Sequence, residues 1–431
     1  MNFTNALNTE VQKNYRFNFT VNLADVALYM FGYSFISPST ILPVFVTHFT
    51  QNPLLLGLIP FINTAGFLVP QLFSSNLIER APLKKFYPFN LGIFLERLPV
   101  FILVAVTFFF AGTGKNTALI LFFLLYAWHT AGAGFLMVGW QDMIAKIIPV
   151  DKRGRFFGFS NFIGNITGIA GATAVAWMLA RFTFPMGYVY AFGCASACIL
   201  ASWFFLGMSR EPRDTIQKPI ISNREYFKTL PDVVRSNPNF RNFLITQFIT
   251  AFGTMAAGFL MVFALARWDL PDGQAASFSI AMLVGQSGAN IFLGFLADRK
   301  GHKIVLELAI LFNIASFLVA LFSITPAWFY VAFAIRGMSL AASFVSGMAF
   351  PLEFSEPKDR PTYIGLAGTI PGIGGAIAPI IGGILASFLG YPALFGVSIL
   401  LALSGLACMH WLVRDPRHIQ PAPVPIIEMN H

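Results

Sequence analysis

The sequence predicts an all-α integral membrane protein in which twelve transmembrane helices form two related halves of six helices each. The composition is the first reason: 56% of the 431 residues are hydrophobic and only 11% are charged, whereas a soluble domain carries about 25% charged residues. The second reason is that apolar runs of spanning length follow one another along the whole chain. The third is that Lys and Arg gather in every second connection between those runs.

The length of each apolar run is near the ~20 residues that an α-helix needs to cross the hydrocarbon core of a bilayer. The alternating segments of a membrane β-barrel, each of about ten residues, do not occur in the sequence. The predicted spans are 21–46, 54–76, 87–111, 117–140, 156–180, 188–208, 241–266, 275–297, 304–324, 327–350, 363–387 and 391–413.

The longest polar stretch, 209–240, separates the first six predicted spans from the last six. We therefore expect a cytoplasmic N-terminus over 1–20, a first half over 21–208, a cytoplasmic linker over 209–240, a second half over 241–413 and a cytoplasmic tail over 414–431. This orientation places 23 of the 28 Lys and Arg residues inside and 3 in outside loops, as the positive-inside rule requires. The first residues also lack the features of a signal peptide, so we expect a multi-pass protein of the cytoplasmic (inner) membrane with both termini in the cytoplasm.

The two predicted halves carry similar short sequences in the same order. The matched pairs are SREPRD (209–214) with VRDPRH (413–418), SNLIERAPLK (75–84) with GFLADRKGHK (294–303), and DKRGRFFG (151–158) with KDRPTYIG (358–365). Three matched pairs in one order indicate duplication of a six-helix unit.

The sequence GFLADRKGHK resembles the signature that the major facilitator superfamily carries between helices 2 and 3 and often repeats between helices 8 and 9. The better copy lies in the second half of this chain, whereas the first copy has lost its glycines and has Glu in place of Asp. The matching residues are Gly294, Asp298, Arg299, Gly301 and Lys303 in the second copy, and Glu79, Arg80 and Lys84 in the first. The resemblance covers about 15–418 and implies the six-plus-six fold of that family.

The resemblance also implies a secondary active, proton-coupled transporter, or a facilitative one, that carries a small molecule by alternating access. Helices 1, 4, 7 and 10 should then line a central cavity, and helices 2, 5, 8 and 11 should form the interface between the halves. The many glycines of predicted helices 5 and 11 agree with close helix approach. The signature loops are expected to act as gates, forming an ion-pair latch between the halves, or else to be plain positive-inside loops.

A few polar side chains in the expected cavity helices are candidates for the substrate and ion pathway. They are Asp25 and Tyr29 in helix 1, His129 in helix 4, Gln247 in helix 7, and Arg336, Ser339 and Ser343 in helix 10. A charge near the bilayer centre costs at least about 2.5–3.5 kcal/mol on insertion scales, so each charge needs a reason. Arg336 could bind an anionic group or pair with an acid that holds its helix in place. The serines share one helical stripe with Arg336, and we expect this stripe to face the cavity.

The remaining charges within the first half admit two interpretations each. Asp25 is predicted to be a protonatable coupling site, or else to hydrogen-bond a neighbouring helix. Histidine titrates near neutral pH, so His129 is a functional candidate, with a packing role as the alternative. Glu96 and Arg97 are adjacent, so we expect them to point about 100° apart and to support neighbouring helices rather than contact each other.

Two further acidic residues are expected near the cytoplasmic face. Glu307 should belong to the second signature loop. Asp142 follows Trp140 at the end of helix 4, and it could pair with Arg153 or Arg155 to close an inner gate. The alternative is an interfacial aromatic anchor followed by solvated polar residues.

The sequence contains no HExxH, P-loop or GxSxG motif, so no catalytic, cofactor-binding or metal-binding residue is predicted and the chain is not expected to be an enzyme. No basic face with exposed aromatics suggests nucleic-acid binding. We expect a monomer whose partners are a small-molecule substrate and the lipid bilayer. The rival interpretations are a drug or lipid efflux carrier and a non-transporting membrane receptor or scaffold with the same fold.

Overall fold

The computed structural model describes residues 3–78, 82–213, 231–347, 349–354 and 360–416. Within these ranges the chain is helical and contains no β-strand, so the predicted all-α class is confirmed. The predicted linker 209–240 is described only at its two ends, and the tail beyond Pro416 lies outside the described residues.

The first half is built from long helices with one irregular segment. Its elements are α1 (Phe3–Ser34), α2 (Ile41–Thr47), α3 (Pro53–Ile78), the π-helical turns η1 (Tyr87–Leu91) and η2 (Ile93–Arg97), α4 (Leu98–Phe110), α5 (Lys115–Ile147), α6 (Val150–Arg181) and α7 (Met186–Gly207). Residues 3–20, which were expected to precede the first span, continue the helix that forms it.

The second half repeats this plan. Its elements are α9 (Pro238–Gly253), η3 (Met255–Phe259), α10 (Leu260–Trp268), α11 (Gly273–Lys300), α12 (His302–Leu321), α13 (Trp328–Gly347), η4 (Phe350–Phe354) and α14 (Arg360–Leu412). Gly390 interrupts α14 with a φ of 80°, so α14 contains both of the last two predicted spans.

Ten helical stretches of the described chain are long and apolar enough to cross a membrane. One of them, Tyr363–Leu412, contains the break at Gly390, and α1 with α2 falls outside the ten because polar residues lower its hydropathy. The count of twelve therefore stays a prediction, which requires α14 to cross twice and α1 with α2 to cross once.

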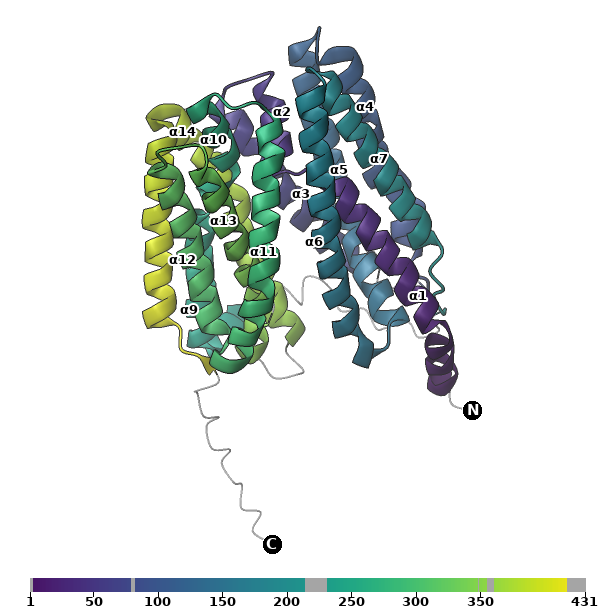
Figure 1. Ribbon diagram of the computed structural model, residues 1–431. Helices are drawn as coiled ribbons and strands as arrows, with labels where there is room; N and C mark the ends of the chain where they lie inside the picture. Colours follow the sequence, from purple (N-terminus) through teal and green to yellow (C-terminus); the bar gives the residue numbers. More distant parts are fainter. Residues whose placement is uncertain (1–2, 79–81, 214–230, 348, 355–359, 417–431) are drawn as a thin grey trace.

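The two halves lie side by side and are not parallel (Figure 1). They meet where α3 packs against α14 and α6 packs against α11, which correspond to predicted helices 2, 5, 8 and 11. In Figure 1 the two halves converge at the end that carries α2 and α10, and they diverge at the end where α1 begins and α14 ends. We call these the far end and the terminal end.

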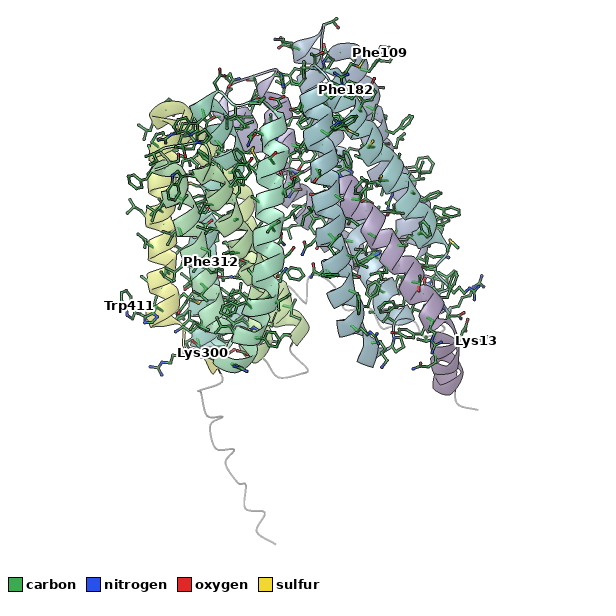
Figure 2. All side chains as sticks on the ribbon, viewed as in Figure 1. Lys13, Phe109, Phe182, Lys300, Phe312 and Trp411 are labelled. Atoms are coloured by element: carbon green, nitrogen blue, oxygen red, sulfur yellow. The ribbon has the colours of Figure 1, made fainter. Side chains whose placement is uncertain are left out.

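The side chains on the outer face of the bundle are mainly apolar. Phe101, Phe204 and Phe292 are among the large hydrophobic residues that are more than 60% exposed, which is expected where lipid rather than water is the solvent. Figure 2 shows Lys13 and Lys300 at the terminal end and Phe109 and Phe182 at the far end. Both labelled lysines thus lie at one end of the bundle, and the orientation of that end in the membrane stays a prediction.

Candidate functional site

The third predicted span begins with two π-helical turns instead of a regular α-helix. Pro99 has no backbone N–H, so the carbonyl of Leu95 cannot receive the usual i to i−4 hydrogen bond. Gly132 of α5 packs against this carbonyl so closely that an added Cβ would lie 2.0 Å from the Leu95 oxygen. The glycine therefore lets α5 approach the irregular backbone. Such π-helical segments occur frequently at functional sites.

Glu96 and Arg97 end the second π-helical turn, and their side chains contact each other. Both residues are at least 93% buried. Our expectation that they diverge was wrong, because it assumed a regular α-helix and ignored how far two flexible side chains can fold together. The pairing is physically required, since two isolated charges at this depth would both be unfavourable.

Glu96 also joins the third span to two neighbouring helices. The Tyr29 hydroxyl of α1 donates to a Glu96 carboxylate oxygen over 2.7 Å. The His129 ring of α5 lies with Nδ1 2.8 Å from the Glu96 carbonyl oxygen. His129 is buried in this contact, and this geometry matches the packing interpretation of the histidine.

Asp25 lies between α1, α5 and α7, and it is 4% exposed. One carboxylate oxygen accepts a hydrogen bond from Ser202 Oγ over 2.5 Å, and the other accepts from Trp140 Nε1 over 3.4 Å. Among the described side chains no cation contacts this carboxylate.

We call Asp25, Tyr29, Glu96, Arg97 and His129 the first-half polar cluster. It contains two carboxyl groups and one guanidinium, and the guanidinium is already paired with Glu96. With a neutral histidine the cluster carries one unbalanced negative charge, which a single proton would neutralise.

The second half has a different centre. Arg336 lies in the middle of α13, is half-buried, and donates from Nη1 to Ser339 Oγ over 3.2 Å. No acidic side chain pairs with Arg336 in the ranges that the structure describes. An acid that would tether α13 through Arg336 is therefore not found in these ranges. A bound anion would give the guanidinium a negatively charged partner.

The polar stripe expected beside Arg336 is buried against α12 at Ser339. Ser339 is 2% exposed and donates to the Ala309 carbonyl of α12 over 2.8 Å, so this part of the prediction was wrong. Ser343 is exposed and donates to the Ser339 carbonyl over 3.0 Å. Gln247 is half-buried in α9 without a hydrogen bond to another described side chain.

The first signature loop is only partly visible. Glu79 and Arg80 lie outside the described residues. The Lys84 ammonium is 3.5 Å from Asp142 and donates to the Ile78 carbonyl over 2.9 Å. Asp142 thus has a partner in Lys84.

The two basic partners expected for Asp142 are found elsewhere or are not described. The side chain of Arg153 lies outside the described residues, and the Arg155 guanidinium lies 5.7 Å from the centre of the Phe159 ring.

The second signature loop makes a tight turn between two helices. Gly301 has a φ of 97°, which favours glycine, and it separates α11 from α12. Gly294 lies within α11, the Arg299 side chain is exposed, and the side chain of Asp298 lies outside the described residues.

Lys303 connects this loop to the end of α14. Its ammonium lies 3.6 Å from Glu307 and donates to the His410 carbonyl over 3.0 Å, while Glu307 is 3.3 Å from His410 Nδ1. Like the contacts of Lys84 with Asp142 and Ile78, these contacts stay within one half. A latch between the halves at the terminal end therefore remains a prediction.

Glu211 is a residue that sequence reasoning missed. Its carboxylate accepts from the backbone amides of Lys84 and Lys85, each over 2.8 Å, and lies 2.9 Å from the Lys146 ammonium. Burial lowers the pKa of the Lys85 ammonium from its ordinary value, and the Glu211 charge opposes this shift. The available signal was the repeated acid of SREPRD and VRDPRH. Sequence reasoning also missed His48, which contacts the second half at the far end.

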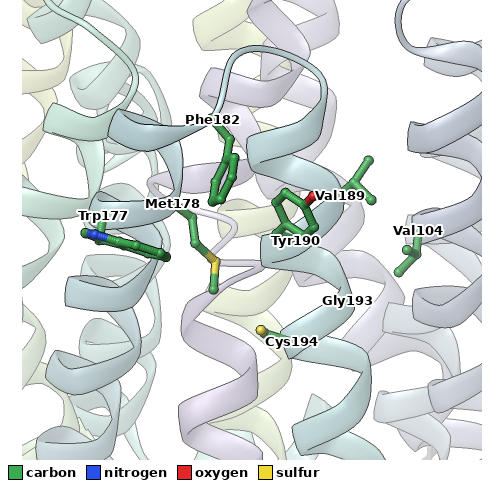
Figure 3. Close-up of a pocket in the computed structure, with 8 residues that line it drawn as sticks. All are labelled: Val104, Trp177, Met178, Phe182, Val189, Tyr190, Gly193 and Cys194. Atoms are coloured by element: carbon green, nitrogen blue, oxygen red, sulfur yellow. The ribbon is translucent and has the colours of Figure 1, made fainter.

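An open apolar groove of about 520 Å³ lies on the first half, between α4, α6 and α7 (Figure 3). It is lined by side chains such as Trp177, Phe182 and Cys194, and Trp177 is 61% exposed. None of the polar candidates lines this groove, so we do not assign the candidate site to it.

The chain resembles two curated proteins over part of its length. It is 26% identical over 145 residues to the MFS-type transporter ppzB of Metarhizium rileyi, and 28% identical over 183 residues to the benzoate transport protein of Acinetobacter baylyi. These stretches cover 33% and 40% of this chain, but only 30% and 39% of the two relatives.

The fold is similar to that of solved transporters. A mutant of the nucleoside transporter NupG superposes with a TM-score of 0.71 at 13% sequence identity, covering 91% of this chain and 100% of that one. The sequence profile of the Major Facilitator Superfamily matches residues 26–288 and 243–428. Because this profile matches most of the chain, the chain belongs to the Major Facilitator Superfamily.

Proposed function

We propose that this protein is a secondary transporter that carries a small organic anion across the membrane by alternating access, coupled to protons. The observation that carries the proposal is Arg336, a cation in the middle of α13 with no acidic partner among the described residues. An unpaired charge within a span is unfavourable. A substrate carboxylate would compensate it, because the planar guanidinium matches a carboxylate with two parallel hydrogen bonds.

The choice of substrate class has one independent support. One relative that matches part of the chain is a benzoate transport protein, and benzoate is an aromatic carboxylate. From this relative we take only the chemical class of the substrate, a small carboxylate with an apolar body.

The first-half polar cluster supports the coupling to protons. Asp25 is a buried carboxyl group held by two neutral donors, Ser202 and Trp140, without a cation in contact. A carboxyl group in such surroundings can exchange a proton when one side of the membrane gains access to it. We therefore assign anion binding to the second half and proton binding to the first.

The experiment is uptake into proteoliposomes with an imposed proton gradient, using a panel of benzoate, aliphatic carboxylates, an uncharged nucleoside and tetracycline. We expect carboxylates to be carried in preference to the uncharged solute. Arg336→Gln should weaken carboxylate binding by about tenfold or more, and Arg336→Lys should weaken it less, because Lys keeps the charge but loses the fork.

Arg267→Gln is the matched control, since it removes one positive charge at the far end of the second half, outside the centre of the bundle. Carboxylate transport by the Arg267 variant should equal that of the unaltered protein. Efficient transport of uncharged solutes alone, or normal carboxylate binding by Arg336→Gln, would refute the proposed substrate class.

A further inference from the structure

Three residues join the two halves at the far end. His48 follows α2 and Tyr188 lies near the start of α7, both in the first half, whereas Asp272 directly precedes α11 in the second half. His48 Nε2 lies 2.5 Å from Asp272 Oδ2, and the Tyr188 hydroxyl donates to the same oxygen over 2.8 Å. One carboxylate of the second half thus receives two bonds from the first.

Asp272 occupies the position before the first residue of α11, where an aspartate commonly accepts a hydrogen bond from its own helix. Its side chain makes no such capping bond. Where both partners are described side chains, the hydrogen bonds and ion pairs that cross between the halves all end on Asp272. The carboxylate therefore bonds across the interface between the halves and does not cap its own helix.

The two partners in the first half are held in place by aromatic packing. The His48 ring stacks on Phe184 with a centroid distance of 4.0 Å and an interplanar angle of 13°. Tyr188 is 1% exposed and its ring centroid lies 5.0 Å from that of Phe45. Because these rings are already ordered, closing the contact with Asp272 requires little further loss of side-chain freedom.

We propose that His48, Tyr188 and Asp272 form a far-end latch, which holds the two halves together at that end and opens when the far end separates. Its place in a transport cycle rests on the proposed function, but its effect on the separation of the halves does not. The pair is accessible to water, since the side chains of His48 and Asp272 are 27% and 29% exposed. Water can therefore replace the bonds when the halves part.

The latch shifts the equilibrium between far-end-closed and far-end-open molecules without holding all molecules in the closed state. Partly exposed ion pairs add little to the stability of the closed state, whereas hydrogen bonds to a charged group add more. We expect loss of the carboxylate to raise the ratio of far-end-open to far-end-closed molecules by about three- to tenfold. The packing of α3 against α14 between the halves remains in such a variant.

The test measures the distance between nitroxide labels at Thr183 and Ala266, which are exposed residues at the far ends of the two halves. The labels are placed in full-length protein in which Cys194, Cys198 and Cys408 have been replaced, and no substrate is added. Asp272→Asn and His48→Gln should shift the distance distribution towards longer distances. Tyr188→Phe, which removes one hydroxyl only, should shift it less and in the same direction.

Tyr330→Phe is the control. The Tyr330 hydroxyl accepts from Gln274 over 2.6 Å at the same end of the molecule, but both residues belong to the second half. This variant should keep the original distribution. Exchange of the pair, with His48→Asp and Asp272→His combined, should restore much of the closed population.

If the three latch variants have the same distance distribution as Tyr330→Phe, the latch is wrong, whatever the transport assay shows. A shift in the latch variants of a protein that transports none of the tested anions would support the latch and count against the proposed function. The two proposals therefore fail separately.

Discussion

At the terminal end the two halves are built alike. Asn18 of α1 donates to the Arg210 carbonyl over 2.9 Å and accepts from the Arg210 amide over 2.8 Å. Asn239 of α9 makes the same two bonds with Arg414, each over 2.8 Å. In each half an asparagine near the start of α1 or α9 thus fixes the segment that follows the last predicted span of that half.

The aromatic residues beside these asparagines repeat the correspondence. Phe19 packs against Phe156 of α6 with a centroid distance of 5.5 Å, and Phe240 packs against Tyr363 of α14 at 4.4 Å. Phe156 and Tyr363 are equivalent positions in the matched sequences DKRGRFFG and KDRPTYIG. The duplicated unit has kept its terminal framework.

The centres of the two halves have not stayed alike. The first half holds Asp25 and the Glu96–Arg97 pair, whereas the second half holds Arg336 with a neutral hydroxyl as its partner. The two halves thus have equivalent packing contacts at the terminal end but different buried charges at their centres. We propose that the shared framework is structural and that the buried charges serve a function specific to each half.

The largest expected effect concerns the acid that only the first half carries. Asp25→Asn should abolish accumulation of an anion against its gradient, because an amide cannot take up a proton as the carboxylate does. Exchange of substrate between the two sides should persist, since it needs no net proton movement. Accumulation and counterflow in the same proteoliposomes measure both; continued accumulation would move coupling to Glu96 or His129.

The next effect separates the two buried arginines by stability. Arg97→Met leaves Glu96 buried without its partner, which should lower the free energy of unfolding by about 3–5 kcal/mol. Arg336→Met leaves no described acid unpaired, so its stability should be unchanged or higher. Unfolding in detergent compares the two variants.

A double variant provides the check on this interpretation. Combining Arg97→Met with Glu96→Gln should recover much of the lost stability, because the unpaired charge is gone. Equal losses for Arg97→Met and Arg336→Met would instead show that both arginines serve the same structural purpose.

A third prediction concerns the close helix approach at one glycine in each half. An added Cβ at Gly66 of α3 would lie 2.3 Å from the Thr130 side-chain oxygen, and one at Gly285 of α11 would lie 2.1 Å from the Ala334 backbone oxygen. A hydroxyl can rotate away, but a backbone carbonyl cannot. Gly285→Ala should therefore destabilise by about 1–3 kcal/mol and Gly66→Ala by less, as measured by thermal unfolding; the reverse order would contradict this reasoning.

The helical class and the turn at Gly301 could be predicted because apolar runs and a repeated signature depend on local sequence. The division into two halves could also be read from the repeated segments. The Glu96–Arg97 contact could not be predicted, because it depends on a π-helical turn that the regular periodicity does not reveal.

The candidate site was harder to predict than the fold, because a helical stripe does not show which neighbour it faces. Ser339 shares a stripe with Arg336 but bonds to α12. The far-end latch gave no sequence signal either, since His48 and Asp272 lie 224 positions apart and neither is in a motif. Such long-range polar contacts depend on how whole helices are placed.

The smallest expected effect tests the shared framework itself. Asn18→Ala and Asn239→Ala should each destabilise their half through the loss of the same pair of hydrogen bonds, by about 1 kcal/mol per net bond. The two losses should differ in size, because Asn18 is 1% exposed whereas Asn239 is half-buried and water can replace its bonds. Thermal unfolding of both variants, with Gln12→Ala at an exposed position of α1 as the control, measures the difference. A larger loss at Asn239 than at Asn18 would show that burial does not set the strength of this contact, and that the two terminal frameworks, although alike in geometry, are not alike in energy.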